Sequence, residues 1–163
     1  QHMIHDPPHR GGGRPKGSKT KKPVPPAPPR SVVGYARCDV GEQRPTLEKQ
    51  AAAIREHCAA NDLTLVALHV DDGAGSDSLD RPGVRAALAA IRSHEAAALL
   101  VYSADRLTTN IIDLRELLDA DFAPGRARLL CVSGDTDSRT AAGRMSLRLV
   151  TAVAQCNRES RAA

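Results

Sequence analysis

Four short apolar runs of this sequence each end in charged or small polar residues. The four endings read Arg37-Cys38-Asp39, Asp71-Asp72-Gly73, Asp105-Arg106 and Ser133-Gly134-Asp135. Because an arginine guanidinium offers a forked donor to phosphate oxygens, arginines gathered with aspartates at one place would suit the handling of phosphate groups. The alternative is that charged residues follow the runs only because loops face water. The choice between these two interpretations depends on whether the helices and strands that carry these residues bring them together.

The apolar runs read as buried strands, and they alternate with segments of helical spacing. Strands are expected at 31–38, 63–70, 97–102 and 128–133, and helices at 46–60, from 80 to beyond 91, at 110–121 and from 140 onward. This alternation predicts an α/β fold: a mostly parallel four- to five-stranded sheet with helices on both faces and a long C-terminal helix. The carboxyl ends of the parallel strands then meet at one rim, where the four charged endings would gather.

The first 30 residues differ sharply in composition from the rest. They contain eight of the 11 prolines and seven Lys or Arg residues against Asp6 alone, whereas residues 31–163 hold 16 basic and 18 acidic residues. A segment this polar and proline-rich cannot bury enough apolar surface to offset its ordering entropy. We therefore expect a disordered basic tail at 1–30 and one domain at 31–163.

The tail contains the sequence Gly13-Arg14-Pro15-Lys16-Gly17, which is similar to half of an AT-hook, the extended motif that places an arginine in the minor groove of A·T-rich DNA. Gly12 stands where the full motif has its first arginine. The residues expected to contact duplex DNA are Arg14, Lys16, Lys19, Lys21 and Lys22. Such a segment gains affinity by releasing counterions. A generic basic tail that binds any anionic surface is the alternative.

Composition also excludes several classes of protein. No stretch approaches the ~20 apolar residues that a membrane span needs. The four cysteines lie far apart, so neither a zinc site nor a disulfide framework is indicated, and we expect reduced thiols in a cytoplasmic, nucleoid-associated protein without metal or other cofactor. With 2% aromatic residues, the chain lacks the side chains on which single-stranded nucleic acids stack.

Five motifs in order give the chain a resemblance to a known family. They are Tyr35-Ala-Arg37; Gln43, Thr46-Leu47 and Gln50; Asp72-Gly73 to Ser76 with Asp80-Arg81-Pro82-Gly83; Asp105-Arg106-Leu107; and Thr140-Ala-Ala-Gly143-Arg144-Met145. Together, from about Val32 to Arg158, they resemble the catalytic domain of the serine recombinases, the resolvase and invertase group that cuts and rejoins DNA through a phosphoserine. The resemblance implies a catalytic site in which Arg37, Arg81 and Arg106 bind phosphate and Asp72 and Asp105 lie beside them. The alternative is that these arginines are only structural ion-pair partners of Asp72 or Asp105.

This chain departs from the family pattern at the positions that matter most for cleavage. Asp39 stands where the family has its nucleophilic serine, Thr109 where it has a further arginine, and Asn157-Arg158 where a Glu-Arg pair is usual. A carboxylate is already an anion, and two unit charges ~4 Å apart repel by about 4 kcal/mol at an effective dielectric of ~20. We therefore expect impaired cleavage, with Asp39 taking the place of a phosphate among the arginines.

The C-terminal helix carries an apolar stripe of Met145, Leu149 and Val153 at heptad-like spacing. In line with the resemblance, it predicts a homodimer, or a mixed dimer with an intact recombinase. Two other functions stay open: an active recombinase with an unorthodox nucleophile, and a regulatory module that pairs with a recombinase without touching DNA itself.

Overall fold

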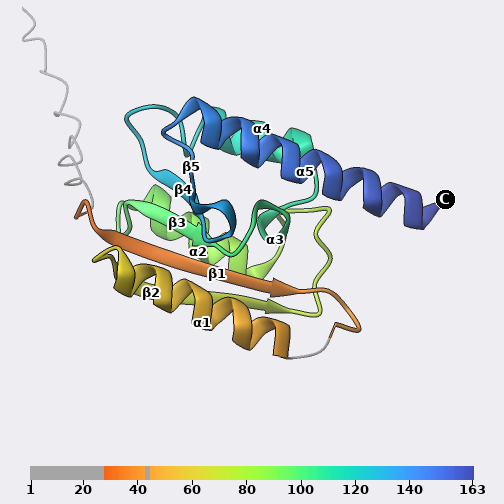
Figure 1. Ribbon diagram of the computed structural model, residues 1–163, viewed down its shortest axis with the longest axis horizontal. Helices are drawn as coiled ribbons and strands as arrows, with labels where there is room; N and C mark the ends of the chain where they lie inside the picture. The colour runs from red at the N-terminus through yellow and green to blue at the C-terminus, as the bar shows by residue number, and fades with distance from the viewer. Residues whose placement is uncertain (1–27, 43–44) are drawn as a thin grey trace, which may run out of the picture.

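A computed structural model describes residues 28–42 and 45–163 of the chain (Figure 1). The elements in order are β1 (Ser31–Cys38), α1 (Pro45–Ala60), β2 (Thr64–Asp72), α2 (Pro82–Arg92), β3 (Ala98–Val101), α3 (Ala104–Leu107), α4 (Ile111–Asp119), β4 (Arg128–Cys131), the 3-10 turn η1 (Ser133–Asp135), β5 (Thr136–Asp137) and α5 (Ala141–Ala162). The strand and helix alternation predicted from the sequence is confirmed.

The five strands form one sheet in the order β2-β1-β3-β4-β5. The first four are parallel, and β5 pairs antiparallel with β4. In parallel pairing Arg37 lies opposite Asp71, and Cys38 opposite Asp72, at the carboxyl end of β1. The register therefore brings two of the predicted charged endings together at one rim.

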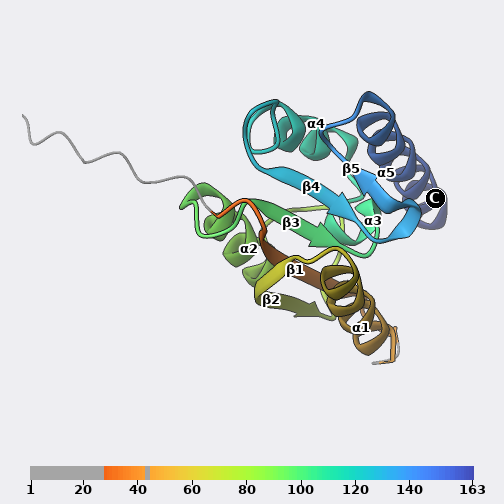
Figure 2. The ribbon, with the colours of Figure 1, turned by 60° about the vertical axis from the view of Figure 1, so that its left-hand side comes forward.

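Helices cover both faces of the sheet (Figure 2). On one face, Ile54 and Cys58 of α1 pack against alternate residues of the central strands, such as Val32 and Leu100. The other face is larger: its core is formed by residues of α2, α4 and α5 packed on Val33, Tyr35, Leu99, Val101, Leu129 and Cys131. All eight residues of β1 are buried, which explains why its sequence is largely apolar apart from Ser31 and Arg37.

The long helix α5 begins in a way that the sequence specifies closely. Thr140 caps it, its hydroxyl accepting a hydrogen bond from the N–H of Gly143 at 2.9 Å. Gly143 lies against β5, where a Cβ atom would fall 1.9 Å from the carbonyl oxygen of Asp137. Only glycine allows this approach. Arg144 then fixes the first turn by donating to the carbonyls of Leu118, in the last turn of α4, and Phe122, just after that helix.

The structure adds details that the sequence did not reveal. The short elements α3, η1 and β5 were not expected separately, and the predicted boundary at residue 30 falls inside an ordered turn. The carbonyl of Arg30 accepts from the N–H of Thr64 at 2.8 Å, and its side chain pairs with Asp62. The predicted DNA-binding residues Arg14, Lys16, Lys19, Lys21 and Lys22 lie outside the described residues. Within those described, no helix is long and apolar enough to cross a membrane.

Candidate functional site

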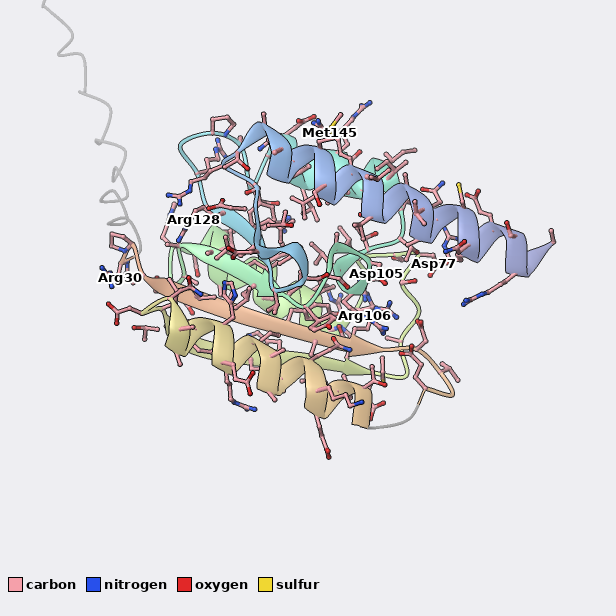
Figure 3. All side chains as sticks on the ribbon, viewed as in Figure 1. Arg30, Asp77, Asp105, Arg106, Arg128 and Met145 are labelled. Atoms are coloured by element: carbon pink, nitrogen blue, oxygen red, sulfur yellow. The ribbon has the colours of Figure 1, made fainter. Side chains whose placement is uncertain are left out.

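A cleft of about 620 Å³ opens at the carboxyl rim of the sheet, under the C-terminal half of α5. Figure 3 shows Asp77, Asp105 and Arg106 in this region, between the end of β1 and α5. The charged residues lining it are Arg37, Asp39, Glu42, Asp77, Asp105, Arg106, Arg158 and Arg161. Their formal charges cancel, four against four. The predicted residues Arg37, Asp39, Asp105 and Arg106 are thus brought together.

Arg37 lies at the end of β1, and its side chain is only 2% exposed. Gln50 of α1 clamps its main chain, accepting from the Arg37 N–H at 3.2 Å and donating to the Arg37 carbonyl at 2.8 Å. The guanidinium donates at 3.0–3.2 Å to the carbonyl oxygens of Ala74, Asp105 and Arg106. One terminal nitrogen also forms an ion pair with the carboxylate of Asp39. Every nitrogen of this guanidinium therefore already has an acceptor inside the protein.

Glu42 engages the second arginine of the rim. Its carboxylate accepts from Arg106 at 2.9 and 3.4 Å, and also from the backbone N–H of Asp39 at 2.8 Å. The hydrogen bond from Arg106 lowers the pKa of Glu42. Burial opposes the charge of Arg106, but the hydrogen bond and charge of Glu42 outweigh it and raise the arginine's pKa. Sequence reasoning missed Glu42, because an exposed glutamate in a loop carries no motif by itself.

Arg81, the third arginine of the expected phosphate site, lies in the interior and does not line the cleft. It is 5% exposed and donates to the hydroxyl of Tyr35 at 2.8 Å and to the carbonyl of Leu107. The Tyr35 hydroxyl donates in turn to Asp71 at 2.8 Å, and Asp71 caps α2 at the N–H groups of Gly83 and Val84. Burial lowers the pKa of Arg81. Its contacts tie α2 and α3 to the sheet.

The two expected aspartates have separate surroundings. Asp72 accepts from the thiol of Cys38 at 3.0 Å, on the face of β1 opposite to Arg37, as the strand period requires. Burial raises the pKa of that thiol, so it stays protonated. Asp105 lines the cleft and accepts from the hydroxyl of Ser103. Of the described residues, no three His, Cys, Asp or Glu side chains gather to hold a metal ion.

Thr109 joins the rim to α5. Its hydroxyl lies 3.0 Å from that of Ser76 and accepts from the Nε of Arg158 at 3.0 Å. From the sequence, Thr109 was only a missing arginine, and Ser76 was only one residue of the second family motif. Their contact could not be foreseen, because 33 residues separate them.

The predicted stripe on α5 faces away from the sheet. Met145, Leu149 and Val153 are 72%, 63% and 52% exposed, and Ile112 at the start of α4 is 61% exposed. Figure 3 shows Met145 on the outer side of α5. Within the part of the chain that the structure describes, each of these apolar side chains leaves more than half of its surface exposed.

A mostly parallel sheet with helices on both faces defines the class of doubly wound α/β domains, whose ligands bind at the carboxyl ends of the strands. The family comparison is more specific. The model "Resolvase, N terminal domain" matches residues 32–163, so the chain belongs to the resolvase family of serine recombinases and is its catalytic-domain type.

Two solved structures share this fold. The N-terminal catalytic domain of TP901-1 integrase is 22% identical, with a TM-score of 0.63, and the match covers 79% of this chain and 97% of that one. A resolvase family site-specific recombinase from Streptococcus pneumoniae is also 22% identical, with a TM-score of 0.59 over 81% and 92% of the two chains. Comparison with curated proteins gave no match.

Proposed function

We propose that this chain is a DNA-associated recombinase domain that holds duplex DNA without cutting it. The observation that carries the proposal is the ion pair of Asp39 with Arg37. Asp39 occupies the position of the family's nucleophile, and it also satisfies the arginine that would face a scissile phosphate. A single residue, Asp39, thereby removes the nucleophile and also occupies an arginine that would donate hydrogen bonds to the phosphate.

The chemistry of Asp39 supports the loss of cleavage. A serine hydroxyl is neutral before activation and can approach a phosphodiester, whereas a carboxylate meets it with a like charge. An attack by Asp39 would also give an acyl phosphate, which water hydrolyses, and the strand would not be rejoined. Thr109 brings no positive charge to stabilise a transition state with developing negative charge.

The cleft alone attracts a polyanion weakly, because its four acidic side chains balance its four basic ones. Affinity for DNA therefore has to come largely from the N-terminal segment, with Arg14, Lys16, Lys19, Lys21 and Lys22 as contacts to phosphates and to the minor groove. The expected ligand is duplex DNA, with a preference for A·T-rich sequence through Arg14.

The exposed stripe on α5 supports a dimer. Met145, Leu149 and Val153 would be removed from water by packing against the same stripe of a second copy. A mixed dimer with an intact recombinase would use the same surface, and the non-cutting subunit would then regulate its partner.

Cleavage of supercoiled plasmid tests the proposal. After incubation, denaturation and protease treatment, the wild-type chain should leave the plasmid supercoiled and form no covalent complex with DNA. The matched variant Asp39→Ser/Thr109→Arg reverses two of the three departures from the family pattern, leaves Asn157 in place, and shows whether this site can then cut. Nicking or a covalent adduct with the unmodified chain would overturn the proposal and favour an unorthodox nucleophile.

A further inference from the structure

A single tight turn, residues 39–42, carries both acidic side chains that contact the arginines of the rim. The N–H of Glu42 donates to the carbonyl of Asp39 at 3.1 Å, and the N–H of Asp39 donates back to the Glu42 carboxylate at 2.8 Å. Gly41, the third residue of the turn, has a φ of +88°, a left-handed value that glycine adopts without strain. The turn therefore fixes the spacing of the two carboxylates.

The two carboxylates lie on the solvent side of the arginines that they contact. Asp39 forms an ion pair with Arg37, and Glu42 forms one with Arg106 at 2.9 Å. The Glu42 side chain is 33% exposed, whereas that of Arg106 is 19% exposed. One turn thus covers both arginines with acidic groups.

The two arginines differ in what they would do if their acid moved away. Arg37 would still donate to the three carbonyls described above. Apart from Glu42, the Arg106 guanidinium donates among the described residues only to the carbonyl of Arg37, at 3.3 Å. Because Arg106 lines the cleft, its guanidinium would then present unpaired N–H groups to a ligand there.

Packing contributes little to the position of this turn. Its tip, Val40, is 82% exposed, and a Cβ atom at Gly41 would meet no heavy atom within 4 Å beyond its chain neighbours. Glu42 is therefore held by hydrogen bonds and charge. The hydrogen bond from Arg106 lowers the pKa of Glu42, so this carboxylate is ionised at neutral pH. Another anion that binds Arg106 can displace it without disturbing the core.

We propose that Glu42 is an internal competitor for the phosphate ligand of Arg106, and that its carboxylate occupies the guanidinium until a backbone phosphate of duplex DNA displaces it. The inference rests on the proposed function for its ligand and adds the residue that limits access to the cleft. A competitor within the same chain acts at a high effective concentration. The apparent affinity of the cleft for DNA is reduced to the fraction of molecules in which Arg106 is free.

The test is duplex binding by the full chain with and without this carboxylate. Glu42→Gln keeps the size of the side chain and removes its charge, so Arg106 gains a phosphate contact and the slope of log K against log salt should steepen by about 0.9. The affinity advantage of the variant should then shrink about 3-fold between roughly 50 and 200 mM salt. The matched control is Asp77→Asn, which removes the same charge from a residue that lines the cleft outside the turn.

A double-mutant cycle with Arg106→Gln separates the release of this arginine from the general loss of an acidic charge. In the Arg106→Gln background, Glu42→Gln should improve binding no more than Asp77→Asn does, because no guanidinium remains to be released. Circular dichroism and thermal melting confirm that each variant is folded.

The outcomes separate this role of Glu42 from the proposed function. A steeper slope for Glu42→Gln that is present with Arg106 and absent with Arg106→Gln supports the role. If the chain binds duplex DNA but Glu42→Gln gains no more than Asp77→Asn, or gains equally in both backgrounds, only the role of Glu42 is overturned. If neither the wild type nor Glu42→Gln binds duplex DNA, both fail, because freeing Arg106 then brings no phosphate contact.

Discussion

Asp39 forms an ion pair with Arg37, two residues before it, at the end of β1. The arginine side chain is 2% exposed and the aspartate 48%, so the carboxylate covers the arginine on its solvent side. The pair stabilises a buried charge that would otherwise need a ligand. By the resemblance noted in the sequence, it also places an anion where the family has its nucleophilic serine.

Arg37 is as much a structural residue as a candidate ligand-binding one. Arg37→Gln should lower the free energy of unfolding by about 2–4 kcal/mol, because it leaves three partly buried carbonyls, those of Ala74, Asp105 and Arg106, without their donor. Arg106→Gln should cost less than about 1 kcal/mol through its ion pair, since the Glu42 partner is partly exposed. Urea unfolding measures both. Equal losses would contradict this difference in roles.

The Glu42–Arg106 pair predicts a pH dependence of stability. Because the folded pKa of Glu42 is lowered from its ordinary value of 4.5, the pair stabilises the fold fully above that pH. This contribution is lost as the pH falls through the lower folded value. The stability difference between wild type and Glu42→Gln, followed by chemical unfolding from neutral to acidic pH, should therefore shrink below about pH 4.5. A difference that grows on acidification would contradict the assignment.

The stripe on α5 predicts a dimer that one charge can split. Leu149→Glu places a carboxylate in the middle of the stripe and should give a folded monomer in sedimentation at micromolar concentrations, where the wild type is dimeric. Val66→Glu is the control, because Val66 is 48% exposed on the edge strand β2 and lies outside the stripe. A wild type that is already monomeric would show that the stripe has another use.

The N-terminal segment should supply most of the DNA affinity. Deleting residues 1–27 removes six basic residues and keeps the ordered turn before β1. If half of these six contact phosphates, the deletion should reduce the slope of log K against log salt by about 3. In the intact chain, a threefold increase in salt should then reduce the affinity that this segment adds by about 20-fold. Arg14→Ala should chiefly remove the preference for A·T-rich duplexes. If the shortened chain binds DNA with unchanged affinity and unchanged salt dependence, the N-terminal segment has no role in DNA binding.

The main strands and helices could be predicted from the sequence because their residue patterns extend over many positions. Eight consecutive buried residues mark β1, and the Thr140 cap with Gly143 marks the start of α5. Elements as short as α3, with four residues, and β5, with two, carry no measurable periodicity. They follow from tertiary packing.

The site was only partly predictable. Register and the strand-end rule bring Arg37, Asp39, Asp105 and Arg106 to one rim. However, no local sequence pattern indicates that Arg81 points into the interior and contacts Tyr35, whereas Arg37 and Arg106 line the cleft. The engagement of Arg106 by Glu42 and the docking of Arg158 on Thr109 likewise depend on contacts between distant segments, which only the folded chain defines.

The most direct test of the central claim is an NMR measurement of the Arg37 guanidinium in isotope-labelled protein, with and without saturating duplex DNA. If Asp39 occupies the place of a phosphate, the Arg37 side-chain N–H resonances should exchange slowly with water and keep their positions when DNA is added. In Asp39→Ser the same resonances should move on DNA binding. Movement of the Arg37 resonances in the wild-type chain, to the extent seen in Asp39→Ser, would show that DNA displaces Asp39 and would contradict the account.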